Sequence, residues 1–482
     1  MLGPMRTVLA LVLASAAFVV LAQPAIPRSR SLDDFIAKEL PISGAPGLAY
    51  AVVEDGEVVS GAHGEVLAGS GRLVTPDTPF LIGSISKSFT AMAVMKLVEA
   101  GKVDLDTRVS HYLDVFADRP SGAITIRQLL SHTSGFSTRQ GNDTHIDRTQ
   151  RADELQRQVA RIARWSPPYA PDTRWQYSNA NYQILGAVIE EVSGQDYASY
   201  MEAEILEPIG MEESFVSDGE SHDAMAVGHQ PWFGSKRPLS DNSTNRVNAP
   251  AGGVISTASD MALYLATMMN GQDDVISAES KAAMLCPASA TSPLYGFGWS
   301  IDPKNGTVRH SGLTPGIETL AVLAPAERRG VVILVNANGG LGFGESAKLF
   351  GGLSSRALGL DDQSGGTSWG RRSLFLTFAL LPVLFVIGIV TAWFRRGGLR
   401  AKSGAFGAFS LWFPLLMTLA LAWTAVYLIP QLFGVPIRTF FLYLPDFVLL
   451  LVASAVTGVL WAVFRLGAFY SGKASPSRPP AS

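Results

Sequence analysis

Residues Ser84 to Ala100 read SISKSFTAMAVMKLVEA. Apolar side chains recur in this segment at helical spacing, and Gly101 follows as a stop signal, so the pattern predicts a helix. Ser84 and Lys87 are three positions apart and therefore lie on one face, at the N-terminal end of that helix. The chain has no other Ser-x-x-Lys sequence.

A serine and a lysine in this arrangement can form a nucleophile and its base. An amine held in an apolar cleft has a lowered pKa, so Lys87 can accept the hydroxyl proton of Ser84. Backbone N–H groups at the helix N-terminus can stabilise a developing oxyanion. The alternative is a capping serine beside an exposed lysine, and the four residues alone do not exclude it.

The first 360 residues predict one antiparallel sheet with an inserted helical region. Strands are expected near both ends, at residues 47–53, 58–59, 297–301, 317–323 and 331–336, with a hairpin turn at Asp55-Gly56. Further helices are expected between them, at residues 182–192 and 258–270. The simplest packing is an α/β (α+β) fold whose site lies in a cleft between the sheet and the helices.

Two other groups of residues can take part in chemistry. Tyr177-Ser178-Asn179 is expected in a loop before a helix. A tyrosine near a cationic lysine can accept a proton, and an asparagine amide can orient a substrate carbonyl or the lysine. His310-Ser311-Gly312 precedes the strand expected from Ile317, and its glycine lets a substrate backbone lie along the strand edge. A core tyrosine and a structural histidine are the alternatives.

Taken in order, Ser-x-x-Lys, Tyr-x-Asn and His-x-Gly resemble the three motifs of the penicillin-recognising serine hydrolases. The likeness is nearest to the branch of class C β-lactamases, D-alanyl-D-alanine carboxypeptidases, D-aminopeptidases and β-lactamase-like esterases. It covers about residues 30–350 and implies their β-lactamase/DD-peptidase-like fold. The surrounding sequence is similar too, at Gly83-Ser84-Ile85-Ser86-Lys87, Leu129 to Gly135, Tyr177 to Tyr182, Ala251 to Thr257 and Gly296-Phe297-Gly298-Trp299.

The resemblance implies a role for each matching position. Ser84 would be the acylated nucleophile, and Lys87 and Tyr177 would share proton transfer. The backbone N–H groups of Ser84 and Leu313 would form the oxyanion hole. The positions expected to bind the substrate are Asn179, His310, Ser311, Gly312 and Leu313.

His310 departs from the pattern of many relatives, which have lysine at the first position of the third motif. A lysine provides a fixed positive charge for a substrate carboxylate, whereas a histidine near neutral pH is mostly neutral. Recognition of a free C-terminal carboxylate, or of a β-lactam carboxylate, is therefore in doubt. A D-amino-acid peptidase or an esterase fits this position better than a true β-lactamase.

Three C-terminal segments are apolar enough to cross a membrane. Residues 373–394, 408–429 and 447–464 carry no charged side chain, and a membrane-spanning helix needs about 17–25 apolar residues. Residues 361–372 are expected to be a linker between residues 28–360 and this transmembrane domain. An anchor or a partner-docking bundle is the simplest role for the three helices, because they contain almost no charge for transport.

Basic residues predict the orientation of these helices. Arg395, Arg396, Arg400 and Lys402 lie between the first two segments, and residues 465–482 carry further basic residues. The positive-inside rule places both regions in the cytoplasm and residues 28–360 on the extracytoplasmic face of the cytoplasmic membrane. Residues 1–22 have a basic start, an apolar run and a small-residue end, which predicts a cleaved signal peptide. An uncleaved anchor helix is the alternative.

Composition excludes several other classes of protein. A net charge of −3 argues against a nucleic-acid binder, and one cysteine, Cys286, excludes a disulfide scaffold. No metal site or cofactor is expected. The sequence predicts a serine hydrolase that cleaves an amide or ester of a small molecule or peptide, and by location a cell-wall fragment. The second hypothesis is a sensor that is acylated at Ser84 without efficient turnover.

Overall fold

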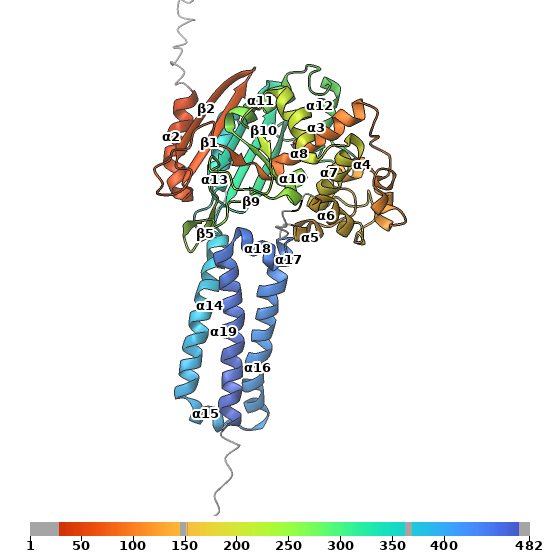
Figure 1. Cartoon of the computed structure of the whole chain (residues 1–482). Helices are drawn as coiled ribbons and strands as arrows, with labels where there is room; N and C mark the ends of the chain where they lie inside the picture. Colours follow the sequence, from red (N-terminus) through yellow and green to blue (C-terminus); the bar gives the residue numbers. More distant parts are fainter. Residues whose placement is uncertain (1–27, 145–150, 152, 362–368, 472–482) are drawn as a thin grey trace, which may run out of the picture.

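The computed structural model describes residues 28–144, 151, 153–361 and 369–471. A globular domain, residues 28–360, lies at one end of a bundle of three long helices (Figure 1). We refer to residues 369–471 as the C-terminal module. The predicted signal peptide, residues 1–22, lies outside the described residues, as does most of the tail predicted at 465–482.

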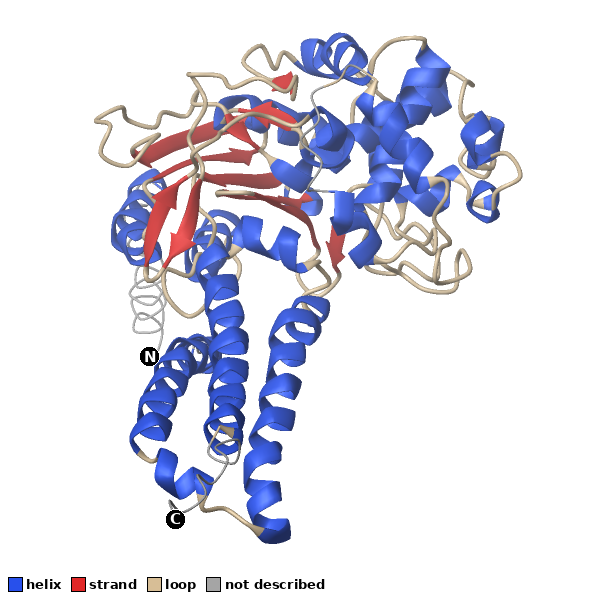
Figure 2. Ribbon diagram, turned by 60° about the horizontal axis from the view of Figure 1, so that its bottom comes forward, coloured by secondary structure: helices blue, strands red, loops and turns tan. Residues whose placement is uncertain are grey.

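The predicted antiparallel sheet is confirmed, and both ends of the globular domain contribute to it. Six strands pair antiparallel in the order β2-β1-β11-β10-β9-β8. Figure 2 shows them as one twisted layer with helices on both faces. Their bounds are β1 Gly47–Glu54, β2 Glu57–Gly64, β8 Ser300–Asp302, β9 Thr307–Thr314, β10 Ile317–Ala324 and β11 Arg329–Val335.

Strand β1 is buried on both faces because helices cover each side of the sheet. Leu48, Tyr50 and Val52 pack with α2 (Arg28–Ser43) and α13 (Ala347–Leu358). The alternate residues, from Ala49 to Val53, pack on the other face with α11 (Ala258–Met269) and the inserted helical region. This two-sided burial accounts for a continuous apolar run where a half-exposed strand would alternate.

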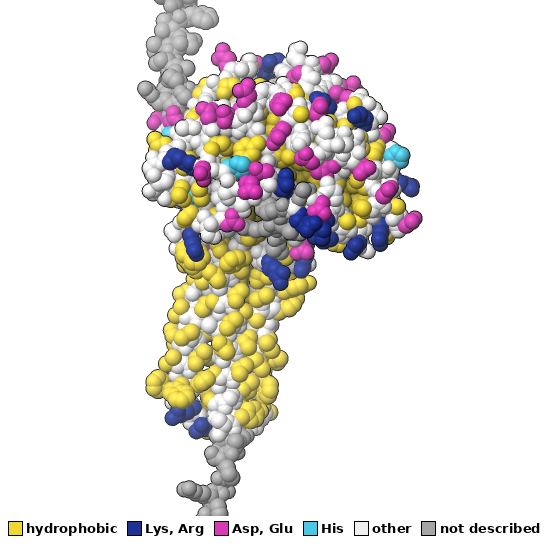
Figure 3. Space-filling view, viewed as in Figure 1, with side chains coloured by type: hydrophobic (Ala, Val, Ile, Leu, Met, Phe, Trp, Pro, Cys, Tyr) yellow, Lys and Arg dark blue, Asp and Glu magenta, His cyan; other side chains and the backbone are white. Residues whose placement is uncertain are grey.

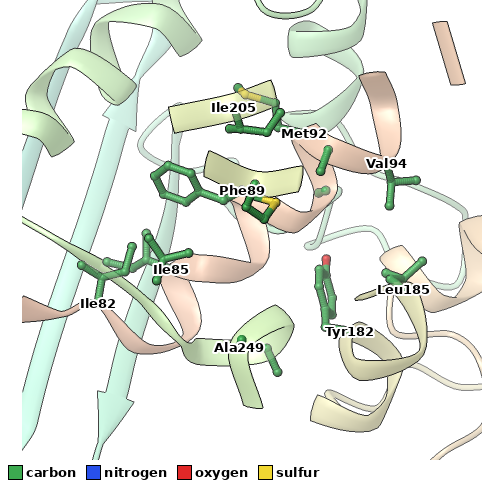
Figure 4. Close-up of a cluster of buried hydrophobic side chains, with 14 of the residues drawn as sticks. Ile82, Ile85, Phe89, Met92, Val94, Tyr182, Leu185, Ile205 and Ala249 are labelled. Atoms are coloured by element: carbon green, nitrogen blue, oxygen red, sulfur yellow. The ribbon is translucent and has the colours of Figure 1, made fainter. Parts of the chain in front are cut away.

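The inserted helical region packs around helix α3, which was predicted from residue 84. Figure 4 shows Ile85, Phe89 and Met92 of this segment in one buried cluster with Tyr182 and Leu185 of α7. The helices are α3 Ser86–Glu99, α4 Ile126–Leu130, α5 Thr138–Asp143, α6 Glu154–Ile162, α7 Asn179–Ser193, α8 Tyr197–Met201, α9 Glu207–Ile209, α10 Ala249–Gly252 and α12 Ala278–Met284.

Short strands and single helical turns complete the globular domain. The strands are β3 Phe80–Leu81, β4 Phe215–Val216 and β7 Val254–Ser256 in one small sheet, and β5 His229–Trp232 with β6 Ser235–Pro238 in a hairpin. The 3₁₀ turns are η1 Gly83–Ile85, η2 Val109–His111, η3 Asp114–Phe116, η4 Pro120–Ala123, η7 Arg246–Asn248 and η8 Pro325–Glu327, and η6 Glu202–Leu206 is a π-helical turn.

Three helices of the C-terminal module are long and apolar enough to cross a membrane: Trp369–Phe394, Gly404–Leu432 and Pro445–Tyr470. Figure 3 shows apolar side chains over their surface and basic side chains at the end far from the globular domain. The elements are α14 Trp369–Phe394, α15 Arg396–Arg400, α16 Gly404–Trp423, the π-helical turn η9 Thr424–Leu428, α17 Ile429–Leu432, α18 Ile437–Tyr443 and α19 Pro445–Tyr470.

Some boundaries differ from those expected. Helix α14 begins at Trp369, inside the segment predicted as a linker, and α19 continues to Tyr470, inside the predicted tail. The strand expected at 297–301 is only β8, Ser300–Asp302. His310-Ser311-Gly312 precedes β10 as expected, but it lies within a strand, β9, that was not predicted. Apolar periodicity does not reveal β9, because this strand mixes polar and apolar residues.

Candidate active site

Ser84 lies in the 3₁₀ turn η1, directly before helix α3, and Lys87 lies in the first turn of that helix. The lysine Nζ is 3.1 Å from the serine Oγ. The Gly83 backbone has a left-handed φ of 58°, and a Cβ at this position would lie 2.8 Å from the Leu313 nitrogen. Only glycine therefore lets the turn that carries Ser84 approach β9 this closely.

Lys87 is fully buried among neutral groups. Besides the serine hydroxyl, its Nζ contacts Asn179 Oδ1 at 2.8 Å and the Ala251 carbonyl oxygen at 2.6 Å. Burial holds the pKa of the Lys87 amine well below its usual range, because desolvation disfavours the charged form. An uncharged amine beside a hydroxyl can accept the hydroxyl proton.

Tyr177 borders the same two residues. The Nζ of Lys87 lies 4.9 Å from the centroid of its ring. Burial raises the pKa of the Tyr177 phenol above its ordinary value, and hydrogen bonding with the Ser84 side chain lowers it in part. The sequence suggested a phenolate beside a cationic lysine, whereas these directions favour a neutral phenol beside a neutral amine.

His132 fixes the loop that carries Tyr177 and Asn179. Its Nδ1 accepts hydrogen bonds from the backbone N–H of Ser178 at 3.2 Å and from Asn181 Nδ2 at 3.1 Å, so the proton of the neutral ring is on Nε2. Its ring also packs against Tyr177, with centroids 4.4 Å apart. Burial keeps the pKa of His132 well below its usual range, so this support stays neutral.

His310 is held as a neutral ring between two partners. Its Nδ1 donates to the Ser311 carbonyl at 2.9 Å, and its Nε2 accepts from the Tyr295 hydroxyl at 3.1 Å. Burial, followed by the proximity of Lys87, lowers the pKa of His310 to about 3. A histidine in this state offers no positive charge to a substrate carboxylate.

The pleat of β9 separates the remaining predicted residues. His310 and Gly312 are buried, whereas the side chains of Ser311 and Leu313 are exposed. A Cβ on Gly312 would overlap the Ile82 carbonyl, so glycine lets the strand pass close to η1. The structure does not bring the Ser311 side chain to Ser84, because alternate residues of a strand point to opposite faces. The Leu313 backbone nitrogen lies beside Gly83, next to Ser84.

A cleft opens beside Ser84 and Asn179. Most of its other described lining residues come from β9 and the turn after it, from the segment 239–253 and from α18. Of the side chains that the structure places in this lining, Asp241 and Tyr443 are ionisable, and no lysine or arginine is among them. The described lining therefore provides no positive charge for a substrate carboxylate.

Four residues of the site were missed by the sequence interpretation. Tyr295 orients His310, and the Asn142 side-chain oxygen accepts a hydrogen bond from Asn179 Nδ2 at 2.9 Å. Leu442 and Tyr443 of the C-terminal module line the cleft. Tyr295 precedes the Gly296-Phe297-Gly298-Trp299 segment, which offered a weak signal. Nothing in the sequence near the other three indicates a site.

No group of His, Cys, Asp or Glu side chains within the described ranges could hold a metal ion. The neutral partners of Lys87 and His310 likewise provide no ligand set for a cation.

The chain belongs to the Beta-lactamase family, which matches residues 32–353. Penicillin-binding protein 4 of Amycolatopsis lactamdurans is 31% identical over 338 residues, 65% of this chain and 86% of that protein. Protein flp of Staphylococcus aureus strain MRSA252 is 24% identical over 420 residues, 84% of this chain and 82% of that protein. The solved octameric penicillin-binding protein homologue from Pyrococcus abyssi has a TM-score of 0.60 and 26% identity, over 70% of this chain and 78% of that one.

These findings confirm the family resemblance inferred from the three motifs. They also confirm the mixed α/β fold with its antiparallel sheet, and the chain is a member of a family of serine hydrolases. The family match ends at residue 353, so it does not include the C-terminal module.

Proposed function

We propose that this protein is a membrane-anchored serine hydrolase that cleaves an amide or ester through an acyl-enzyme on Ser84. The observation that carries the proposal is the 3.1 Å distance between the Lys87 amine and the Ser84 hydroxyl. The lysine is fully buried and its pKa is lowered, so the amine is available as a base near neutral pH.

Proton transfer in acylation follows from the contacts of Lys87. The neutral amine donates its two hydrogens to Asn179 and Ala251 and accepts the proton of Ser84. The serine oxygen then bonds to the substrate carbonyl carbon, whose π electrons move to the oxygen. The N–H groups of Ser84 and Leu313 are the proposed donors to that oxyanion.

Collapse of the tetrahedral intermediate breaks the bond to the leaving group, which needs a proton. The neutral Tyr177 phenol can donate its proton to the leaving group while it receives one from the Lys87 ammonium. This exchange restores the neutral amine, which can then activate water for deacylation. Both carriers lie together, since the lysine Nζ is 4.9 Å from the tyrosine ring centroid.

The neutral site favours substrates without a free carboxylate next to the scissile bond. His310 has a pKa of about 3 and is occupied on both ring nitrogens. The described lining of the cleft provides no lysine or arginine in its place. Esters and internal amides, such as those of D-amino-acid peptides or cell-wall fragments, therefore fit better than C-terminal carboxylates or β-lactams.

The proposed location is the outer face of the cytoplasmic membrane. Three helices are long and apolar enough to cross a membrane. Helix α15 lies at the end of the bundle away from the globular domain (Figure 1), and Arg395, Arg396 and Arg400, in or directly before it, are exposed. The positive-inside rule would keep that end in the cytoplasm and the active site outside.

A second candidate is a sensor that is acylated once and deacylates slowly. It is favoured by the similarity to a protein named as penicillin-binding, penicillin-binding protein 4. Against it, the predicted cytoplasmic loop between the first two long helices, residues 395–403, is too short to hold a signalling domain.

The test uses the full chain in lipid nanodiscs beside its Ser84→Ala variant. Hydrolysis of a short-chain nitrophenyl ester, a chromogenic cephalosporin and D-alanyl peptides is followed, with intact mass at each end point. Ser84-dependent turnover of the ester or an internal amide supports the proposal. A stable adduct on Ser84 without turnover supports the sensor, and turnover that survives Ser84→Ala contradicts both.

A further inference from the structure

The C-terminal module reaches the active site through residues 433–443, the segment between α17 and α19. Figure 1 shows α17 and α18 at the end of the bundle that faces the globular domain. Gly434 and Thr439 of this segment both contact Asn142 of α5: its Nδ2 donates to the Gly434 carbonyl and its carbonyl accepts from the Thr439 hydroxyl, both at 3.0 Å.

Asn142 connects these contacts to the proposed base. Its Oδ1 accepts from Asn179 Nδ2 at 2.9 Å, while Asn179 Oδ1 contacts the Lys87 amine at 2.8 Å. A continuous chain of hydrogen bonds therefore runs from Lys87 through two asparagine side chains to the 433–443 segment. Each asparagine uses its oxygen and its NH₂ group on different partners, which fixes the orientation of its amide.

The end of the segment is held on its other side by the β5–β6 hairpin. Gln230 Nε2 donates to the Leu442 carbonyl at 2.5 Å, and the Phe233 N–H donates to Asp446 Oδ2 at 2.9 Å. Leu442 and Tyr443 lie between these supports and line the same cleft as Ser84 and Asn179. Burial raises the pKa of Tyr443, and the nearby Tyr177 phenol raises it further.

We propose that the 433–443 segment is a working part of the active site, in which Leu442 and Tyr443 form one wall of the substrate cleft and restrict the size of the acyl group. Asn142 is the positioning residue that joins this wall to Asn179 and Lys87. The inference rests on the proposed function and deepens it, because a part of the membrane-borne module then determines specificity.

The kinetic test compares Tyr443→Ala and Leu442→Ala with Phe441→Ala, all as full chains in nanodiscs. Phe441 is an exposed neighbour on the same helix and does not line the cleft. The readout is kcat/KM for a phenylacetyl nitrophenyl ester divided by that for the acetyl ester. The wall variants should raise this ratio about ten-fold, with Phe441→Ala unchanged. A ratio within two-fold of wild type in both wall variants overturns the proposal.

A second test locates the segment without using turnover. A Cβ on Gly434 would lie 3.8 Å from the Thr138 Cβ, within the range of about 3.5–4.5 Å found in disulfides. Thr138→Cys/Gly434→Cys is made in a Cys286→Ser background, with a protease site between residues 361 and 369. A disulfide keeps the two fragments together on a non-reducing gel. Thr138→Cys/Gly404→Cys is the control. Gly404 has nearly the same φ as Gly434, 69° against 68°, but it lies at the far end of the bundle, so no disulfide with residue 138 is expected.

Formation of the disulfide with activity retained supports a wall that stays in place. If the disulfide abolishes activity until it is reduced, the segment is a lid that must open, and the proposal is overturned. The absence of any cross-link also overturns the proposal. If wild type turns over no substrate, the proposed function has failed. The rate at which a fluorescent penicillin labels Ser84 is then measured in place of turnover. Equal labelling rates in Tyr443→Ala and wild type would overturn the proposal that Tyr443 forms a wall of the cleft.

Discussion

The hydroxyl of Tyr295 donates to Nε2 of His310 at 3.1 Å. Since Nδ1 of the same ring donates to the Ser311 carbonyl, Nε2 is the acceptor of the neutral ring. Protonation of Nε2 would require the Tyr295 hydroxyl to turn and accept instead, and burial disfavours the charged ring. The two contacts hold the His310 ring in place and leave it no positive charge for a substrate carboxylate.

His310 also makes stability depend on pH in a defined direction. A histidine in an unfolded chain titrates near pH ~6.5, whereas His310 in the folded protein has a pKa of about 3. Its contribution to stability is therefore complete above the unfolded pKa and is lost as the pH falls toward the folded one. We expect the unfolding temperature of the globular domain to fall more between about pH 7 and 4 in wild type than in His310→Gln.

The comparison is made on full chains by circular dichroism. His132, whose pKa is also lowered by burial, is present in both proteins and cancels in the difference. Equal decreases in the two proteins would be inconsistent with a buried, neutral His310.

Lys87→Met should lower kcat by about 10²–10⁴-fold, because it removes the base and keeps a side chain of similar length. Lys96→Met is the matched control on the same helix, since Lys96 pairs with Glu204 at the surface. In wild type, kcat/KM should increase with pH as Lys87 loses its proton. The midpoint of this increase should lie below the usual pKa of a lysine, because burial lowers the pKa of Lys87. Ester hydrolysis measured across pH gives both the loss of kcat and the pH dependence of kcat/KM. A Lys87→Met enzyme with more than a tenth of wild-type kcat would refute the assignment of Lys87 as the base.

Asn142→Asp separates the two connections of Asn142. A carboxylate can still accept from Asn179, but it cannot donate to the Gly434 carbonyl. Its negative charge favours the ammonium form of Lys87 and so raises the pKa of that lysine. We expect the acidic limb of kcat/KM to move to higher pH by about one unit, with KM changed less than kcat. An unshifted limb would mean that Asn142 is not coupled to the lysine.

The orientation can be read from single cysteines in intact cells. Cys286 is exposed on the globular domain, and it should react with a membrane-impermeant maleimide. A cysteine at Ser403, in the loop between the first two long helices, should react only after permeabilisation in a Cys286→Ser background. The reverse pattern would place the active site in the cytoplasm.

The parts of the site that the sequence predicted are those with a strong local pattern. Ser84 and Lys87 share the first turns of an apolar helix, and the β1 and β11 runs are apolar enough to be recognised as strands. Strand β9 was missed for a local reason, since its residues Thr307–Thr314 mix polar and apolar side chains and show no apolar period.

Asn142, Tyr295 and Tyr443 could not be predicted in the same way. Each acts through a contact with a residue from a different part of the chain; Asn142 and Gly434, for example, are 292 positions apart. The contacts of Asn142 and Tyr443 depend on how the C-terminal module sits against the globular domain, and that of Tyr295 depends on how its loop packs on β9. No spacing rule within one segment carries that information, and the family match ends before the module begins.

The pairing of β1 with β11 constrains the time at which the domain can fold during synthesis. Leu48 lies opposite Val335, so an interior strand waits for a partner that leaves the ribosome roughly 15–60 s later. Until then β1 exposes two apolar faces and an open edge to other chains. Helix α14 begins at Trp369, shortly after β11. The sheet can therefore close only shortly before the first long apolar helix emerges, and β1 is exposed to other chains throughout that interval.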